Sequence, residues 1–266
     1  MLPPPRKDGD FPYWLVVLVA IGAWLFYLAL SDPVYAQALA TLSKGIRMTI
    51  FVTLVGFGLA ALLGLGLAVA TLSRFVVLRQ LARLYIEVVR GVPIIVLLLY
   101  IAFAAAPAAI VAWNWLTAPL GLDPLQTRDF SLLWRAIIAL TIAYSAFIAE
   151  VFRAGLQAVD EGQIEAAKAL GLSGWHRFRF VVFPQAFRMI LPPLGNDFVA
   201  MVKDSSLVSI LGVADVTQLG KVTAAGNFRY FETYNLVALI YLSMTLTLSL
   251  ILRRIEARLR ARQSGR

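Results

Sequence analysis

The sequence predicts an all-α integral membrane protein, and three observations support this prediction. Sixty per cent of the 266 residues are hydrophobic and only 15% are charged, whereas soluble domains contain about 45–50% apolar and about 25% charged residues. The mean hydropathy of +0.79 is that of a lipid-embedded chain. Several apolar runs exceed the roughly 18 residues that a helix needs to cross a bilayer, and they are longer than the alternating segments of a membrane β-barrel.

Six apolar runs are candidates for membrane-spanning helices. They cover residues 14–30, 48–73, 91–122, 136–149, 189–214 and 233–252. Pro107 and Pro119 interrupt the third run, which predicts one span followed by an apolar loop. The fourth run is short and lies between Arg135 and Glu150. The fifth is long enough to span although it contains charged residues, so we expect six transmembrane helices.

The basic residues predict the orientation. With both termini in the cytoplasm, 17 of the 24 lysines and arginines fall in inside segments and six in outside segments. This asymmetry follows the positive-inside rule and accounts for the net charge of +9, so we expect no nucleic acid partner. Residues 1–36 have an alternative interpretation as a cleaved signal peptide, but the apolar run is long for one. We expect a retained helix.

Small residues recur every four positions in the second run, at Gly56, Ala60, Gly64 and Ala68. Such a stripe lets another helix approach closely in lipid. Packing within this chain is the favoured interpretation, and a seam between two chains is the alternative.

The longest polar segment follows the fourth run and predicts two short helices. Asp160 or Glu161 opens the first, and Gly171 ends it. Ser173 can cap the second, and Pro184 is expected to stop it before the next span. The small residues of the first helix would permit close contact with another protein.

This segment carries a family signature. Glu165, Ala166 and Ala167, followed by Gly171 and Pro184, match the Glu-Ala-Ala motif of ABC-importer permeases. Further matches lie at residues 44–50, 85–93, 143–144, 149–153, 162–167, 191–196 and 203–207. Together they cover roughly residues 42–256, and the sequence resembles the polar amino acid (histidine/glutamine-type) branch of these permeases. The helix at 14–30 and the length of the outer stretch 105–135 depart from the usual pattern.

The resemblance implies a type I ABC importer permease fold with three regions. Residues 1–43 hold an additional helix, 44–256 form the permease domain with a coupling loop at 153–188, and 257–266 form a basic cytoplasmic tail. Implied partners are ATP-binding cassette ATPase subunits docking at the motif, a second permease chain (identical or paralogous), and a periplasmic or lipid-anchored substrate-binding protein. The implied location is the bacterial inner membrane, and the implied cargo is a polar amino acid.

No chemistry is expected from this chain alone. Its Gly220-Lys221 pair is followed by Val222 and lacks the earlier glycine of a P-loop, so ATP and Mg²⁺ would bind the partner ATPase. There is no cysteine, and the single histidine, His176, cannot form a metal cluster. We therefore expect a non-enzymatic transporter subunit without cofactor or metal.

Polar residues inside the spans are candidates for the substrate pathway. An ionisable group at the centre of a spanning helix costs about 2.5–3.5 kcal/mol on insertion scales and marks a functional site or a compensating partner. The candidates are Lys203, Asp204, Ser205 and Ser206 in the fifth run, with Tyr144, Ser145, Asn196 and Glu150 elsewhere. The alternative for the fifth run is a structural ion pair with other spans, and for Glu150 a local pair with Arg153.

Two other classes compete with the importer. A stand-alone secondary transporter or channel is permitted by composition but leaves the coupling loop unexplained. A purely structural membrane subunit would not need polar groups inside its spans. The particular amino acid, and the identity of the second permease, stay open at this level.

Overall fold

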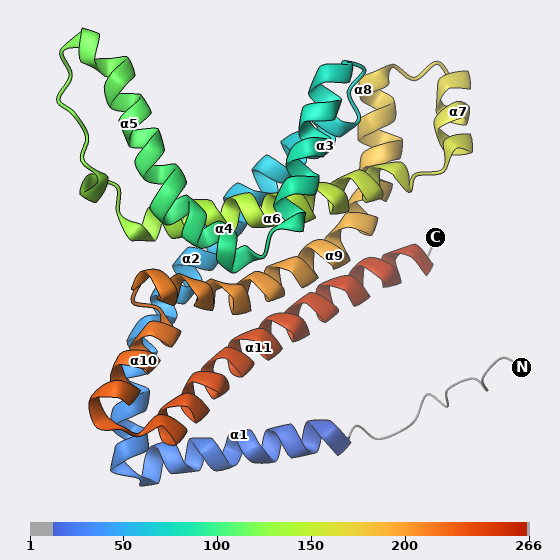
Figure 1. Cartoon of the computed structure of the whole chain (residues 1–266). Coiled ribbons are helices and arrows are strands. Elements are labelled where there is room, and N and C mark those ends of the chain that lie inside the picture. Colours follow the sequence, from blue (N-terminus) through green and yellow to red (C-terminus); the bar gives the residue numbers. More distant parts are fainter. Residues whose placement is uncertain (1–12, 265–266) are drawn as a thin grey trace, which may run out of the picture.

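The computed structural model describes residues 13–264, and this part of the chain is helical without strands (Figure 1). The α-helices are α1 (Tyr13–Ser31), α2 (Pro33–Thr71), α3 (Val76–Gly91), α4 (Ile94–Tyr100), α5 (Ala106–Thr117), α6 (Leu132–Gln157), α7 (Glu161–Ala169), α8 (Gly174–Arg177), α9 (Phe183–Asp204), α10 (Val216–Asn227) and α11 (Tyr230–Ser264). Two π-helical turns, η1 (Ile101–Ala105) and η4 (Phe178–Val182), and three 3₁₀ segments, η2 (Ala118–Leu120), η3 (Thr127–Asp129) and η5 (Ser205–Leu211), complete it. The all-α prediction is confirmed.

Four helical stretches within the described residues are long and apolar enough to cross a membrane. They are Pro33–Thr71, Ile94–Leu120, Leu132–Gln157 and Tyr230–Arg258. The apolar part of α1 is shorter, at Val16–Ser31, and α9 carries charged residues and gives way to 3₁₀ geometry after Asp204. Six helices therefore stand where six spans were expected, while the count of six spans remains a prediction.

The contacts between helices fix their relative directions. A Cβ on Gly56 of α2 would meet Leu140 of α6, and one on Gly64 would meet Ile148, so α2 and α6 run parallel. Gly155, late in α6, faces Ile190, early in α9, so these two helices are antiparallel. The ends of α2 and α6 consequently lie on the same side of the molecule, and the segments that follow them, α3 and α7, share that side.

The small-residue stripe of α2 packs inside this chain. Gly56, Ala60, Gly64 and Ala68 are all buried. At Gly64 an added Cβ would lie 2.9 Å from Ile148 Cγ2 and 3.0 Å from the carbonyl oxygen of Ser145. The backbones of α2 and α6 can approach this closely only without a side chain. The interpretation as packing within the chain is confirmed.

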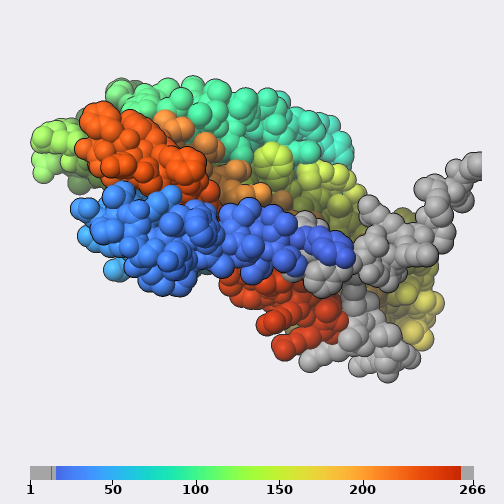
Figure 2. Space-filling view, turned by 90° about the horizontal axis from the view of Figure 1, so that it is seen from below, coloured from blue at the N-terminus to red at the C-terminus, as the bar shows by residue number. Residues whose placement is uncertain are grey.

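The additional N-terminal helix α1 pairs with α2 and α11. Ser31 ends α1, and the Asp32 side chain accepts a hydrogen bond from the Val34 amide to start α2 (2.8 Å). Leu25, Leu28 and Ala29 then pack into one apolar cluster with residues of α2, α10 and α11. Figure 2 shows α1 (dark blue) across this face beside α11 (red). The helix is therefore an integral part of the fold.

A buried polar network holds α10 against α2 and α11. Asp215 caps α10 by accepting from the Gln218 amide (2.8 Å), and its other oxygen accepts from the Tyr241 hydroxyl of α11 (3.0 Å). The Val216 amide donates to Thr49 of α2 (3.3 Å). A Cβ on Gly45 would lie 2.6 Å from the Val216 nitrogen, so α2 meets the α10 backbone directly.

Two proline predictions are wrong. Pro107 does not break the third run, which stays helical from Ile94 to Leu120, and Pro184 does not stop the second loop helix but lies in the first turn of α9. In both places a π-turn ends two residues before the proline, η1 before Pro107 and η4 before Pro184. A wider turn accommodates the missing amide and the ring, so the helix continues.

Candidate substrate pathway and coupling surface

The charged part of α9 meets α6 through one hydrogen bond. The Tyr144 hydroxyl donates to Asp204 Oδ2 at 2.7 Å. Tyr144 lies near the middle of α6 and is buried, and Asp204 is half-buried at the last residue of α9. A carboxylate inside a membrane needs such a donor, because lipid offers none. This pair is the polar centre of the spanning region.

Asp197 joins this centre and was not among the predicted site residues. It lies seven positions before Asp204, so the two carboxylates share one face of α9, about 10 Å apart along its axis. It acts electrostatically on Tyr144. Its Oδ2 is buried and has no hydrogen-bond partner among the described residues. The spacing of seven was the signal in the sequence that could have identified it.

The helix changes geometry at the predicted motif. After Asp204 the chain continues as the 3₁₀ segment η5, which ends at Gly212 with φ 76°. Ser205 is fully buried and donates back to the Val202 carbonyl (2.7 Å), so its hydroxyl is used locally. Ser206 is half-buried, and Lys203 is exposed on the side of α9 away from Tyr144. The structure thus separates Lys203 from Asp204, as adjacent helix positions require.

Two other predicted residues lie away from the Tyr144–Asp204 pair. Ser145 is buried between α6 and α3, where its hydroxyl bonds the Tyr85 hydroxyl (2.9 Å) and donates to the Ile142 carbonyl (2.8 Å). Asn196 is exposed on α9, and its side chain leaves the helix about 100° away from that of the neighbouring Asp197. Neither contacts Asp204 in this arrangement.

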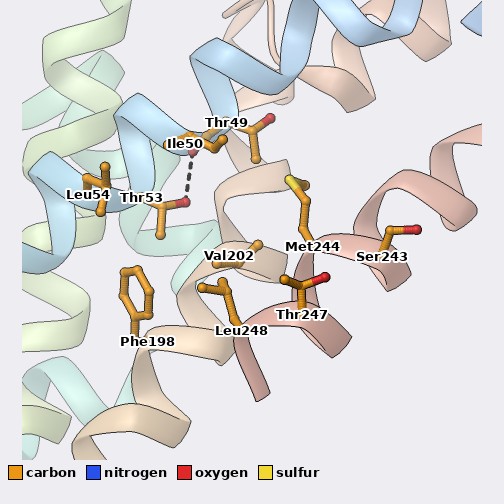
Figure 3. Close-up of a pocket in the computed structure, with 10 residues that line it drawn as sticks. All are labelled: Thr49, Ile50, Thr53, Leu54, Phe198, Val202, Ser243, Met244, Thr247 and Leu248. Atoms are coloured by element: carbon orange, nitrogen blue, oxygen red, sulfur yellow. Dashed lines mark hydrogen bonds between the residues drawn. The ribbon is translucent and has the colours of Figure 1, made fainter. Parts of the chain in front are cut away.

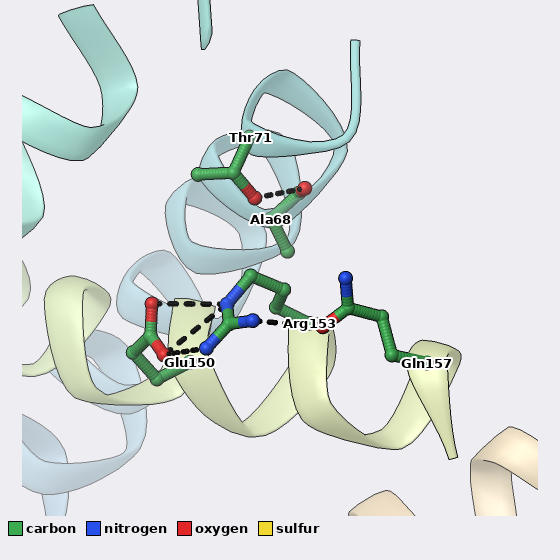
Figure 4. Close-up of polar contacts among 5 residues, drawn as sticks. All are labelled: Ala68, Thr71, Glu150, Arg153 and Gln157. Carbon is green, nitrogen blue, oxygen red and sulfur yellow. Dashed lines mark hydrogen bonds and ion pairs between the residues drawn. The ribbon is translucent and has the colours of Figure 1, made fainter. Parts of the chain in front are cut away.

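Glu150 pairs with Arg153 one turn further along α6 (Figure 4). Arg153 Nη2 lies 2.5 Å from Glu150 Oε2, and Arg153 Nη1 donates to Gln157 Oε1 at 2.7 Å. Glu150 follows Tyr144 by six positions, which places this pair about 9 Å closer to the end of α6. The local-pair interpretation describes this contact.

A cavity of about 410 Å³ lies between α2, α9 and α11 (Figure 3). Its walls carry the side chains of Thr49, Ile50, Thr53, Leu54, Phe198, Val202, Ser243, Met244, Thr247 and Leu248. Thr53 donates to the Thr49 carbonyl (2.8 Å) rather than into the cavity. The lining has hydroxyl groups but no charged side chain, so this space has no ionic partner for the ammonium and carboxylate of an amino acid.

The coupling loop presents one helix on the surface. Asp160 caps α7 by accepting from the Gln163 amide (3.2 Å). Ala167 is buried, whereas Glu165 and Ala166 are exposed. The hydrogen bond from Lys168 to Glu165 (2.7 Å) holds the pKa of this carboxyl below its ordinary value.

Gly171 follows α7 with a φ of 73°, in the left-handed region that favours glycine. No atom lies within 4 Å of where its Cβ would be. The constraint within this chain is therefore backbone conformation. Ser173 then caps α8 by accepting from the His176 amide (3.4 Å), and exposed His176 stacks on Phe180.

No cluster of three or more His, Asp or Glu side chains able to hold a metal ion occurs among the described residues. An all-helical fold with several apolar helices long enough to cross a bilayer is that of an integral membrane protein.

The comparisons with known proteins identify the family. Residues 60–264 match the family described as "Binding-protein-dependent transport system inner membrane component", and the chain belongs to this family. It is 36% identical over 223 residues, 84% of this chain and 94% of the relative, to the glutamine transport system permease protein GlnP of Escherichia coli (strain K12). It is also 36% identical to the probable amino-acid permease protein YxeN of Bacillus subtilis (strain 168), over 81% of this chain and 89% of that protein.

Solved structures support the same family assignment. A chain from the "Crystal structure of an amino acid ABC transporter with histidines" superposes with a TM-score of 0.71 at 36% identity, covering 84% of this chain and 96% of that one. The inward-facing MetNI methionine ABC transporter superposes with a TM-score of 0.63 at 20% identity, which shows the shared fold. The chain is thus a membrane permease subunit of the ABC importer class, in which ATP is hydrolysed by a separate chain.

Proposed function

We propose that this permease carries polar amino acids into the cell, with the substrate's ammonium group meeting the Asp197–Asp204 face of α9. The observation that supports this most is the Tyr144–Asp204 bond beside the unpartnered Asp197 oxygen. A positively charged group between these carboxylates would replace the hydration that a membrane interior withholds. The named relatives handle glutamine and other amino acids.

The other predicted pathway residues do not contact Asp204, and this proposal gives them secondary roles. Asn196 and Lys203 share the exposed face of α9, where a donor is available to a substrate carboxylate. Ser206 stands at the start of the 3₁₀ segment, a geometry that often marks a hinge. Ser145 joins α6 to α3 through its bond with Tyr85, whereas Ser205 and Glu150 bond residues of their own helical segments.

The energy would come from ATPase subunits that dock on the solvent-exposed face of α7 in the cytoplasm. Glu165 and Ala166 face outward, and Gly171 turns the chain directly after them, while Ala167 and Pro184 fix the loop to the body. Closure of the ATPases would move α7. Because α7 lies in the loop between α6 and α9, this motion would also shift α6, which carries Tyr144, relative to α9, which carries Asp204. A second permease chain and a substrate-binding protein complete the importer, with six spans and both termini in the cytoplasm.

Copurification and ATPase stimulation test the proposal. The permease should copurify with an ATP-binding cassette subunit, and the reconstituted complex should hydrolyse ATP faster when a polar amino acid and the binding protein are present. A panel of neutral, acidic and basic amino acids would identify the substrate. A chain that purifies without an ATPase and transports alone would contradict the proposal.

A further inference from the structure

Helix α3 (Val76–Gly91) has three distinct faces, although its segment was expected only as an inside loop. Ala82, Ile86 and Val89 are buried, and Ile86 and Val89 pack with Ala146 and Ala149 of α6. A second face repeats at i, i+4, i+7 and i+11 and is apolar but exposed: Val77 is 72%, Leu81 59%, Leu84 61% and Val88 56% exposed. The third face is polar, at residues 79, 83, 87 and 90.

The position of α3 in the chain places its start on the side of the molecule where α2 ends. It follows the end of α2, on the side where α6 ends and the coupling loop begins (Figure 1). At Val92 and Pro93 the backbone becomes extended, so the chain changes direction before the spanning segment Ile94–Leu120 starts. Ile86 and Val89 pack against Ala146 and Ala149 near the middle of α6, so α3 begins on this side and inclines toward the membrane interior.

The arginines of α3 and of the turn before it differ in the contacts that they make. Arg90 lies over the Phe147 ring (5.7 Å to its centre), and Arg79 donates to the Ser73 carbonyl (3.1 Å). Arg83 is exposed and acts on Glu150 only at a distance. Arg74 is exposed and has no hydrogen bond or ion pair among the described residues. Two cationic side chains are therefore free to take an anionic partner.

We propose that α3 lies in the inner interface of the membrane, with its Val77–Val88 stripe among the acyl chains and Arg74 and Arg83 binding the phosphates of anionic phospholipids. Exposed apolar residues between arginines have the chemistry of an interfacial helix, and each basic side chain near an anionic surface strengthens binding about fivefold. This assignment rests on the proposed inside position of α3 and not on the identity of the substrate.

The bound lipid would support the substrate pathway through one contact. Tyr85 on α3 hydrogen-bonds Ser145 on α6, the residue next to Tyr144. A helix anchored to lipid on one face and bonded to α6 on another holds that part of α6 in place. The lipid composition of the membrane would thereby affect the Tyr144–Asp204 contact.

Single cysteines test where the faces of α3 lie, because the chain has none of its own. Leu84→Cys and Glu87→Cys, labelled with the same fluorophore, are compared in the full transporter reconstituted in nanodiscs of phosphatidylcholine with 30% phosphatidylglycerol. Bromine-labelled acyl chains should quench the probe at position 84 strongly and the probe at 87 weakly, with iodide in the water giving the reverse order. A probe at position 84 reached by neither quencher would show that protein covers this stripe and would overturn the proposal.

The headgroup is tested with the same probe. Brominated phosphatidylglycerol should quench the position-84 probe at several-fold lower mole fraction than brominated phosphatidylcholine, and Arg74→Gln with Arg83→Gln should remove most of this preference, about fivefold for each arginine. Arg128→Gln, an exposed arginine in the outer stretch, is the matched control and should change nothing. Equal quenching by both lipids in the unmodified arginine background would overturn the anionic site. The assay uses neither ATP nor amino acid, so its failure is distinct from a failure of the transport proposal.

Discussion

At the scale of single residues, Asp204 is the predicted pathway residue that contacts another helix through its charge. It is an acidic side chain at the end of a membrane-embedded helix, with one short hydrogen bond from Tyr144. Asp204→Asn preserves its size and removes its charge. We expect the complex to assemble while amino acid uptake falls roughly tenfold or more, since a hydrogen bond to a charged group contributes about 1.5–3 kcal/mol.

Tyr144→Phe separates charge from geometry. It removes the hydroxyl and leaves the carboxylate, so we expect a smaller loss of uptake than in Asp204→Asn. Initial rates over a range of substrate concentrations measure both variants. Uptake by Asp204→Asn at the rate of the unmodified transporter would show that the residue is structural.

Gly171 is constrained by its backbone, and the substitution Gly171→Val tests the coupling loop. Valine disfavours a φ of 73°, so the turn after α7 should change and substrate should no longer stimulate ATPase activity. Gly121 has a φ of 67° and open space around it in the outer stretch. Gly121→Val therefore carries a similar strain and should leave the ratio of stimulated to basal ATPase activity intact. An equal loss of coupling in both variants would contradict the role of Gly171.

At the scale of helices, the close contact of α2 with α6 depends on Gly64. Gly64→Ala would place a methyl group 2.9 Å from Ile148 Cγ2, and overpacking typically costs about 1–3 kcal/mol. We expect a lower melting temperature in detergent. Gly66→Ala on the same helix meets nothing within 4 Å and is the control; equal melting temperatures would refute the tight contact.

The sequence predicted the helices better than their ends. Charge-free runs located the membrane-embedded helices, because apolar length is what a bilayer selects. The behaviour of Pro107 and Pro184 was mispredicted, since a π-turn before a proline leaves no mark in residue type. The amphipathic α3 was missed because its arginines were considered only as charges that set orientation.

The candidate site was predictable in part for the same physical reason. The cost of burying charge singled out Asp204, but which groups meet depends on the packing of α6 against α9. Packing of α6 against α3 turned Ser145 toward Tyr85, and packing against α9 brought Asp197 to the Tyr144 side. The spacing of seven within α9 could have placed Asp197 on the face of Asp204, but no spacing within a single helix predicts which residues of another helix that face meets.

At the scale of the whole molecule, six spans with both termini in the cytoplasm remain a prediction, and cysteine labelling tests it. Single cysteines at Ser43, Thr127 and Thr223 should react with an impermeant reagent in intact cells. Cysteines at Ser173 and Ser264 should react only after permeabilisation. Reaction at position 173 in intact cells would contradict the predicted topology.

The direct test of the central claim is ATP-driven uptake. Proteoliposomes containing this permease, its ATPase and, on the outside, its binding protein should accumulate a labelled polar amino acid against its gradient when ATP is present on the ATPase side. They should accumulate none with a non-hydrolysable analogue, whatever ion gradient is imposed. Accumulation driven by an ion gradient without ATP would contradict the account and identify a secondary transporter.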